Sequence, residues 1–453
     1  MQAAPPRSGL QAPTLIATGL VAAVAYVVGL MVLMSVTDYD TWGGMVLGPL
    51  LLLLALPAFR RQAAREGDPR VFWFLTLALV AKLASTLVML YVIFDLYEGT
   101  ADAVRYHRHG IDIKETIRHG GALDPVRTLT GTSFIRLLTG ILYSITGPTL
   151  LGGSLFFSWL GFWGLFFFYR AFILAVPEGR PRTYGRLLFF LPSMLFWSSA
   201  IGKEAWMLFA LGLTAFGAAL LLEGGLRGLP VIATGLWLTA MVRPHMAGLV
   251  AVGLVFGAVL RRPRGELRQL APVVRGFLIL LLAGMAWFAV VRAESFLGVD
   301  DLTSAEGLTV ALEGTAQRTD RGGSRFVPSL VRSPERAPGA VAQVVFRPFL
   351  FEAENGQTII AGLETTFLLL YSFARLPWFL SALRNLRRRP YLMFALAYTC
   401  MFIVAFSSMA NFGILARQRV QLLPFYLALL ALPSGLSKRD RQGTLQQDLA
   451  RGQ

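Results

Sequence analysis

Long apolar stretches separated by short charged loops make up most of this chain. They cover residues 12–36, 44–59, 71–95, 150–176, 187–201, 205–222, 229–242, 246–260, 274–291, 358–373, 391–409 and 420–436. Their lengths approach the roughly 20 residues with which an α-helix crosses a bilayer, whereas a transmembrane barrel would show short alternating segments. The pattern therefore predicts an all-α polytopic membrane protein with about twelve transmembrane helices.

Positive charge is concentrated in every second loop. The arginine- and lysine-rich loops are residues 60–70, 180–186, 261–268, 384–389 and 438–441. Basic residues mark the cytoplasmic ends of membrane spans. This alternation therefore places both termini in the cytoplasm and predicts a multi-pass protein of a bacterial plasma (inner) membrane. The same rule explains the net charge of +16 in a chain that is 55% hydrophobic, without a nucleic-acid partner.

One apolar stretch does not fit the alternation. Residues 131–147 are short and carry Arg136, and counting them as a span would invert every later loop. We expect an amphipathic juxtamembrane helix lying flat on the outer face. The chain is then a single transmembrane domain, residues 1–453, with long outer loops at residues 97–149 and 292–357. Because the second loop is rich in Gly and Pro, we expect it to be partly mobile and to cover an acceptor groove.

Asp102 begins a polar stretch just outside the third predicted span. If this stretch is helical, Asp102, Tyr106 and His109 share one face. A carboxylate there can accept a proton from an incoming hydroxyl; alternatively, Asp102 only complements the dipole of a solvated helix start. Tyr106 and His107 complete the catalytic candidates. We predict no metal at the His-x-His pair, because residues two apart diverge on a helix and no third ligand is nearby in sequence.

Two very short outer turns carry charge near the level of the lipid head groups. Lys203 and Glu204 lie in one turn, and Arg243 and His245 lie in the other. Ionisable groups are costly at this depth and are commonly functional, and the arginine fork suits bidentate phosphate recognition. The alternatives are that Lys203 and Glu204 pair with each other in water, and that Arg243 snorkels to lipid phosphates.

Other arginines lie where the positive-inside rule disfavours them. Arg417 and Arg419 precede the last predicted span, and Arg347 ends the long second loop. An anionic ligand would compensate for them, because arginine pairs strongly with phosphate oxygens. Lys82 and Glu364 lie within predicted spans, where each is a functional candidate. The structural alternative, which we favour slightly, is that these two pair with each other.

Together these elements resemble the GT-C superfamily of membrane glycosyltransferases. The resemblance rests on Asp102 before an amphipathic helix, the hairpin at residues 192–204, Arg243 in its minimal turn, and Arg417-Gln-Arg419 before a span. It covers most of the chain by topology and short stretches by motif. The hairpin and the Arg-x-Arg element are also similar to those of exopolysaccharide and O-antigen polymerases, which use lipid-linked oligosaccharides.

The resemblance implies a glycosyltransferase whose donor is a polyprenyl-phosphate or polyprenyl-diphosphate sugar. The acceptor would be a cell-envelope glycan or lipid at the outer face, and Asp102 would be the base. The donor phosphate would lie among Lys203, Glu204, Arg243, His245, Arg347, Arg417 and Arg419, since fixed cations stabilise the charge that builds on a departing phosphate. A divalent cation, Mg²⁺ or Mn²⁺, is a candidate cofactor that outer carboxylates would hold, such as Asp300, Asp301 and Asp320.

Three alternatives stay open. The family's acidic residue usually follows the first span, so Asp38 or Asp40 is an alternative base, although amphipathic helices follow Asp102 and not the earlier pair. A transporter or flippase of a lipid-linked or anionic glycan would need similar cations, but transporters often show repeats and broken helices near the midplane. A scaffold for an envelope assembly complex would tolerate loss of the outer charges.

Overall fold

The computed structural model of the chain describes residues 11–121, 129–259, 303–320, 325–331, 334–353, 355–384 and 389–432, with residue 386 and short pieces between residues 276 and 294. Across these residues the regular elements are helices, and β-pairing is limited to an isolated bridge between Arg325 and Asn411. The predicted all-α fold is therefore confirmed for the described part of the chain.

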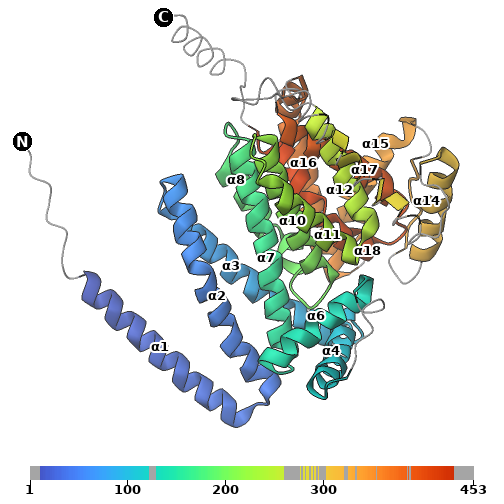
Figure 1. Ribbon diagram of the computed structural model, residues 1–453. Helices are drawn as coiled ribbons and strands as arrows, with labels where there is room; N and C mark the ends of the chain where they lie inside the picture. Colours follow the sequence, from blue (N-terminus) through green and yellow to red (C-terminus); the bar gives the residue numbers. More distant parts are fainter. Residues whose placement is uncertain are drawn as a thin grey trace, which may run out of the picture.

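The helices form one bundle, from which α1 leans away and meets α2 near their connecting turn (Figure 1). The first half contains α1 (Gln11–Val36), α2 (Tyr39–Glu66), α3 (Arg70–Tyr91), a π-helical turn (Val92–Leu96), α4 (Asp102–Arg118), α6 (Gly131–Thr146), α7 (Leu150–Ala175), α8 (Pro181–Phe190), α9 (Pro192–Phe196) and α10 (Lys203–Leu222). The second half contains α11 (Gly228–Val242), α12 (Pro244–Val259), α14 (Ala305–Thr319), α15 (Ala337–Phe346), α16 (Gly356–Arg384), α17 (Pro390–Phe406), α18 (Phe412–Arg419) and α19 (Leu423–Leu430).

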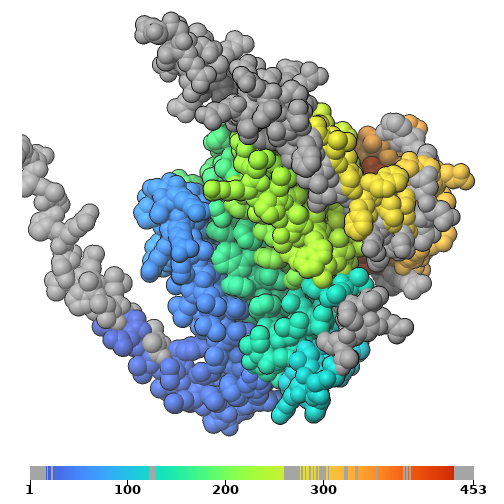
Figure 2. All heavy atoms as spheres, in the orientation of Figure 1, coloured from blue at the N-terminus to red at the C-terminus, as the bar shows by residue number. Residues whose placement is uncertain are grey.

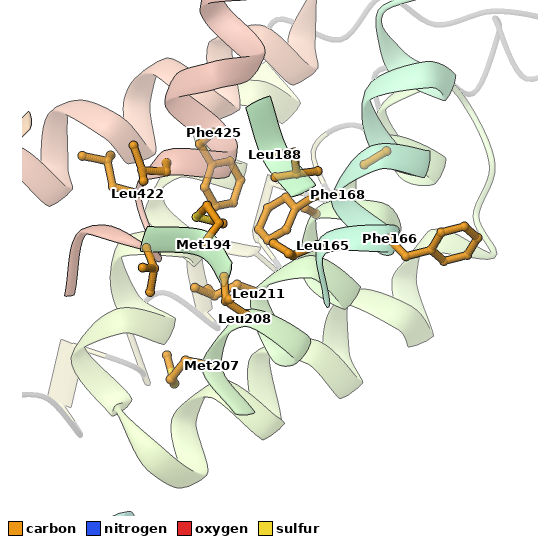
Figure 3. Packing of buried hydrophobic residues seen from close by; sticks show 14 of the residues in the cluster. Leu165, Phe166, Phe168, Leu188, Met194, Met207, Leu208, Leu211, Leu422 and Phe425 are labelled. Carbon is orange, nitrogen blue, oxygen red and sulfur yellow. The ribbon is translucent and has the colours of Figure 1, made fainter. Parts of the chain in front are cut away.

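The central helix of the bundle is α7, which packs against α2, α3, α8 and α10. Its residues are apolar on every side, as expected for a helix with no solvent-facing stripe. The ring of Phe168 meets Phe425 of α19 edge-on at 5.0 Å, and Figure 3 shows Leu165 and Leu188 beside this pair. Segments far apart in the sequence therefore share one core.

Glycines allow α7 and α10 to approach closely. A Cβ atom on Gly212 would collide with the backbone of Gly164, and a Cβ atom on Gly164 would collide with the backbone of Leu208. Small residues at helix crossings permit this backbone contact in membrane proteins. The α7–α10 crossing therefore depends on glycine at both positions.

Six described helices are long and apolar enough to cross a membrane. They are Gly19–Val36, Tyr39–Glu66, Arg70–Leu96, Leu150–Ala175, Lys203–Leu222 and Gly356–Leu380. These helices support a membrane-embedded protein, although the expected twelve spans are not confirmed. Four shorter helices are also apolar: Gly228–Val242, Pro244–Val259, Ala337–Phe346 and Pro390–Phe406.

The stretch expected to form one span at residues 187–201 is interrupted. Helix α8 ends at Phe190, Leu191 is extended (φ −60°, ψ 132°), and α9 covers only Pro192–Phe196. Proline disfavours helical geometry in the residue before it, so Pro192 explains the break. Of the predicted span at residues 420–436, residues 433–436 lie outside the described residues, and α19 covers eight residues.

Opposite charges hold the two ends of α9. At its start, the Glu364 carboxylate accepts hydrogen bonds from the backbone N–H of Ser193, at 2.6 Å, and from the Ser193 hydroxyl. At its end, Lys82 Nζ donates to the carbonyl oxygens of Met194 and Leu195 at 2.8 and 2.6 Å. This arrangement matches the helix dipole. Lys82 and Glu364 therefore do not pair with each other, and our prediction of a direct pair is wrong.

Helices α4 and α6 pack side by side at one end of the bundle (Figure 1). The stretch expected to lie on the surface forms α6, which is not among the candidate membrane spans. Figure 2 shows α4 and α6 together on the surface of this end, below α11 and α12. The predicted loop at residues 292–357 contains α14 and α15; its coverage of an acceptor groove stays a prediction.

We expect Gly212→Leu to destabilise the bundle by at least about 3 kcal/mol, because the new side chain overpacks the α7–α10 crossing. The measurement is the midpoint of thermal unfolding of purified protein. The matched control is Gly29→Leu, since a Cβ on Gly29 of α1 meets nothing within 4 Å. Equal midpoints for the two variants would contradict the proposed role of the crossing.

Candidate functional site

A cluster of four charged side chains, from three helices and the turn between α11 and α12, lies at the α4/α6 end of the bundle. It consists of Asp102 at the start of α4, Glu204 in the first turn of α10, Arg243 after α11, and Arg417 on α18. We call these four residues the ion cluster. The sequence analysis singled out all four, and the structure brings them together across more than 300 positions of sequence.

Glu204 is the centre of the ion cluster, because each of its carboxylate oxygens binds a different arginine. Arg243 Nη2 donates to Glu204 Oε1 at 3.0 Å, and Arg417 Nη2 donates to Oε2 at 2.9 Å. Arg417 also donates from Nη1 to Asp102 Oδ2 at 3.1 Å. Arg417 therefore connects a buried carboxylate to a second carboxylate.

The two carboxylates differ strongly in exposure. The side chain of Glu204 is 3% exposed, whereas that of Asp102 is 42% exposed. Glu204 also raises the pKa of Arg417 above its ordinary value through the attraction between their charges. Arg417 is therefore a permanent cation, and Asp102 is the carboxylate of the cluster that a substrate in solution can reach.

Local sequence explains how the two arginines are presented. Pro244 follows Arg243, which is extended (φ −142°, ψ 85°), as residues before proline prefer, so α11 ends where Arg243 begins. The Asn411 side chain accepts a hydrogen bond from the backbone N–H of Ile414 at 3.1 Å. It thereby caps the helix that carries Arg417.

Lys203 adds a cation with no ion pair beside the ion cluster. Its charge interacts with Glu204 and Asp102 and is opposed by Arg243 and Arg417. In the part of the chain that the structure describes, no carboxylate lies within salt-bridge distance of its Nζ atom. Lys203, Arg243 and Arg417 outnumber the two carboxylates, so this region has an excess positive charge.

Tyr106 lies beside the ion cluster, one helical turn after Asp102. It is 4% exposed, and its pKa is raised to about 12, first by burial and then by the negative charges of Asp102 and Glu204. The phenol therefore stays protonated at neutral pH and can donate a hydrogen bond. Of the three residues expected on one helical face, Asp102 and Tyr106 lie in α4 at the cluster, whereas His109 Nδ1 lies 3.6 Å from Asp112 Oδ2.

His107 belongs to a different contact. Its Nδ1 atom lies 2.8 Å from the hydroxyl of Tyr143, which donates to the carbonyl oxygen of Thr149 at 3.0 Å. Burial lowers the pKa of His107, so the ring is neutral at pH 7. The alternative base Asp40 lies in this region too, where its carboxylate accepts from the backbone N–H of Leu150 at the start of α7. These contacts connect α4, α6 and α7.

The remaining phosphate-binding candidates lie apart from these contacts. Arg347 Nε donates to both carboxylate oxygens of Glu352, at 2.9 and 3.1 Å, and its guanidinium lies over the rings of Phe326 and Phe412. His245 is half-buried near the start of α12 and lines a cavity against α14 and α17. Arg419 is 2% exposed and donates from Nη1 to the carbonyl oxygen of Val345 at 2.8 Å.

Gln418 is a member of the site that the sequence analysis missed. Its side-chain oxygen accepts hydrogen bonds from Arg243 Nη1 and, at 2.8 Å, from Gln421. Its position between the two arginines of the Arg-Gln-Arg element is the sequence feature that could have identified it. Gln418 thus accepts a hydrogen bond from the Arg243 N–H group that does not contact Glu204.

Within the described ranges, no group of three or more His, Cys, Asp or Glu side chains gathers closely enough to hold a metal ion. Of the three carboxylates named for a divalent cation, Asp320 follows α14, and Asp300 and Asp301 lie outside the described residues.

The fold and the ion cluster define a helical membrane-embedded protein with a positively charged, partly open site at one end of its bundle. No known protein family, curated protein or solved structure matches this chain. The function must therefore be argued from the site itself.

We expect Glu204→Gln to destabilise the protein by about 3–5 kcal/mol, because removing one partner of a buried ion pair leaves the other charge uncompensated. Here two arginines lose their shared anion. The measurement is the thermal midpoint at neutral pH. Glu352→Gln is the control, because Glu352 is itself more exposed than Glu204 and binds a single arginine; a midpoint loss as large as that of Glu204→Gln would contradict a special role for Glu204.

Proposed function

We propose that this protein is a membrane glycosyltransferase that uses a polyprenyl-phosphate or polyprenyl-diphosphate sugar. The observation that carries the proposal is that Arg417 joins a reachable carboxylate, Asp102, to a buried group of cations. Glycosyl transfer needs both parts, a proton acceptor for the incoming hydroxyl and positive charge for the departing phosphate.

The reaction would proceed by direct displacement at the anomeric carbon of the donor. The acceptor hydroxyl gives its proton to Asp102 while its oxygen forms the new glycosidic bond. The bond between the anomeric carbon and the phosphate oxygen breaks, and the phosphate keeps the electron pair. Lys203 and Arg417 neutralise this charge, because both interact with Asp102, at which the acceptor is deprotonated.

Arg417 would exchange partners during the reaction. In the structure its Nη1 atom is hydrogen-bonded to Asp102, and an arriving phosphate competes with that carboxylate for the same N–H group. Moving Arg417 Nη1 onto phosphate frees Asp102 Oδ2 to act as base, while Arg105 Nη2 stays 3.2 Å from Oδ1. Glu204, itself bound to Arg243, stays in place and holds the Arg417 guanidinium, as a preorganised group that needs no rearrangement during the chemical step.

The donor, the acceptor and the side of the membrane follow from the resemblance and the charge pattern. The α4/α6 end would face outward with both termini in the cytoplasm of a bacterial cell. A polyprenyl chain would lie in the membrane beside the bundle, and a cell-envelope glycan or lipid would approach Asp102 from outside.

One observation favours a transporter or flippase as the second candidate. The broken helix α8–α9 contains Pro192, and its short half is held by the buried Lys82 and Glu364. Interrupted helices with buried charge are typical of transporter binding sites. A transporter would move a lipid-linked or anionic glycan without consuming the donor, so product formation distinguishes the two functions.

The test is sugar transfer by purified protein from a panel of labelled polyprenyl-phosphate and polyprenyl-diphosphate sugars. We expect Asp102→Asn to slow transfer by about 10²–10⁴-fold through loss of the base, and Arg417→Gln to slow it by about 10²–10³-fold through loss of charge stabilisation. Asp112→Asn is the matched control, because Asp112 is a more exposed carboxylate of the same helix. Folding is checked by the thermal midpoint.

Equal rates for Asp102→Asn and Asp112→Asn would remove Asp102 as the base. Movement of the donor across vesicle membranes with no consumption of the sugar would instead support the transporter.

A further inference from the structure

A second site lies on the other face of α18, in a cavity bounded by α3, α9, α16 and α18. Its volume is about 290 Å³. Most of its surface is apolar, from residues such as Val88, Phe196, Trp197 and Ile360, and its polar lining includes Gln357, Glu364 and Arg419. None of the ion-cluster residues lines this cavity.

Two hydrogen-bond donors at this cavity are unused. Arg419 Nε and Gln357 Nε2 are buried, and neither has an acceptor within the described part of the chain. The other contacts of these side chains are made elsewhere: Arg419 Nη1 donates to Val345, and Gln357 Oε1 accepts from Tyr97. Buried donors without acceptors are costly, so a ligand that supplies acceptor oxygens would be stabilised here.

The positive charge of Arg419 favours an anionic ligand. The nearest carboxylate, Glu364, directs both of its oxygens to the backbone N–H and hydroxyl of Ser193. It attracts Arg419 through space, but the two residues make no salt bridge in the described structure. A phosphate head group fits these conditions, because its oxygens accept from the arginine and the glutamine together.

The apolar walls require the rest of the ligand to be a hydrocarbon. Val88 on α3 and Ile360 on α16 line the cavity, and they are 55% and 59% exposed. Both residues belong to candidate membrane spans, so this side of the cavity faces lipid. Ligand pockets typically measure about 300–1,000 Å³, so this cavity holds a head group and the start of one chain, and the remainder extends into the bilayer.

The geometry of α18 separates this cavity from the ion cluster. Residues two apart on an α-helix point about 200° away from each other. Arg417 accordingly contacts Asp102 and Glu204, whereas Arg419 contacts Val345 and lines the cavity. The two arginines share no hydrogen-bond partner.

We propose that this cavity binds a single-chain amphiphile with a phosphate head group, which enters from the membrane and is held by Arg419 and Gln357. The site is additional to the ion cluster and does not depend on the proposed transfer reaction. It gives the protein a lipid-binding function that would remain if the reaction at Asp102 were of another kind.

The test uses full-length protein in phosphatidylcholine nanodiscs and a polyprenyl phosphate with a photoreactive group on its first isoprene unit. Crosslinked peptides are mapped by mass spectrometry, which separates this cavity from lipid bound elsewhere. We expect crosslinks to the segment of Phe196 and Trp197 or to the start of α16. Ile360→Trp should reduce them at least tenfold by filling the cavity. Ile359→Trp is the matched control, since Ile359 is an exposed neighbour that does not line the cavity.

Arg419→Gln should also reduce the crosslinks, and Ile360→Trp keeps the test valid if Arg419→Gln fails to fold. Asp102→Asn should leave the crosslinks unchanged.

Undiminished crosslinking in Ile360→Trp would overturn the proposal. Competition by inorganic phosphate would show a site for free phosphate, and equal competition by phosphatidylglycerol would show a site for bulk phospholipid; either result would also overturn it. If Ile360→Trp loses the crosslinks but keeps sugar transfer, the proposed glycosyltransferase function still stands.

Discussion

The pairing of Glu204 with two arginines is the interaction on which the site depends. An isolated charge buried at this depth is very costly, and here the buried Glu204 carboxylate pairs with the buried Arg243 and the half-buried Arg417. Glu204 can stay ionised only if Arg243 and Arg417 remain beside it, and each arginine comes from a different part of the chain. The same requirement fixes the ends of α10, α11 and α18 relative to one another. Asp102 joins this framework through Arg417 while staying open to solvent, so its position is rigid and its carboxylate is reachable.

A second charged framework supports the bundle around α9. A helix of five residues has no stability of its own, yet its second residue, Ser193, binds Glu364 and its carbonyl oxygens bind Lys82. These contacts place Phe196 and Trp197 between the cavity and the rest of the bundle. The ion cluster and the α9 contacts both lie beside α18, which carries Arg417 towards one and Arg419 towards the other. Helix α18 is thus the element through which the two sites are positioned.

Much of the architecture was predictable, because long apolar stretches and alternating charged loops constrain where each turn can lie. The assembly of Asp102, Glu204, Arg243 and Arg417 follows from placing every second loop at the same end of a bundle. Pro192 indicated a helix break, but the length of the apolar stretch at residues 187–201 favoured one continuous span. The partners of Lys82 were not predictable, since they are the Ser198 hydroxyl and carbonyl oxygens that the end of α9 leaves free. Arg347 was expected to bind phosphate, although Glu352, five residues later, offered a local partner. Helical spacing alone could have shown that Arg417 and Arg419 face different sites.

The central claim is that Arg417 leaves Asp102 to bind the donor phosphate. Its most direct test is an electron cryomicroscopy structure of the full-length protein with a non-hydrolysable polyprenyl-phosphate sugar. The account predicts phosphate density in contact with Arg417 and Lys203, the anomeric carbon directed towards Asp102, and the Arg417–Glu204 pair intact. A phosphate bound away from Lys203, with Arg417 still joined to Asp102, would contradict the account.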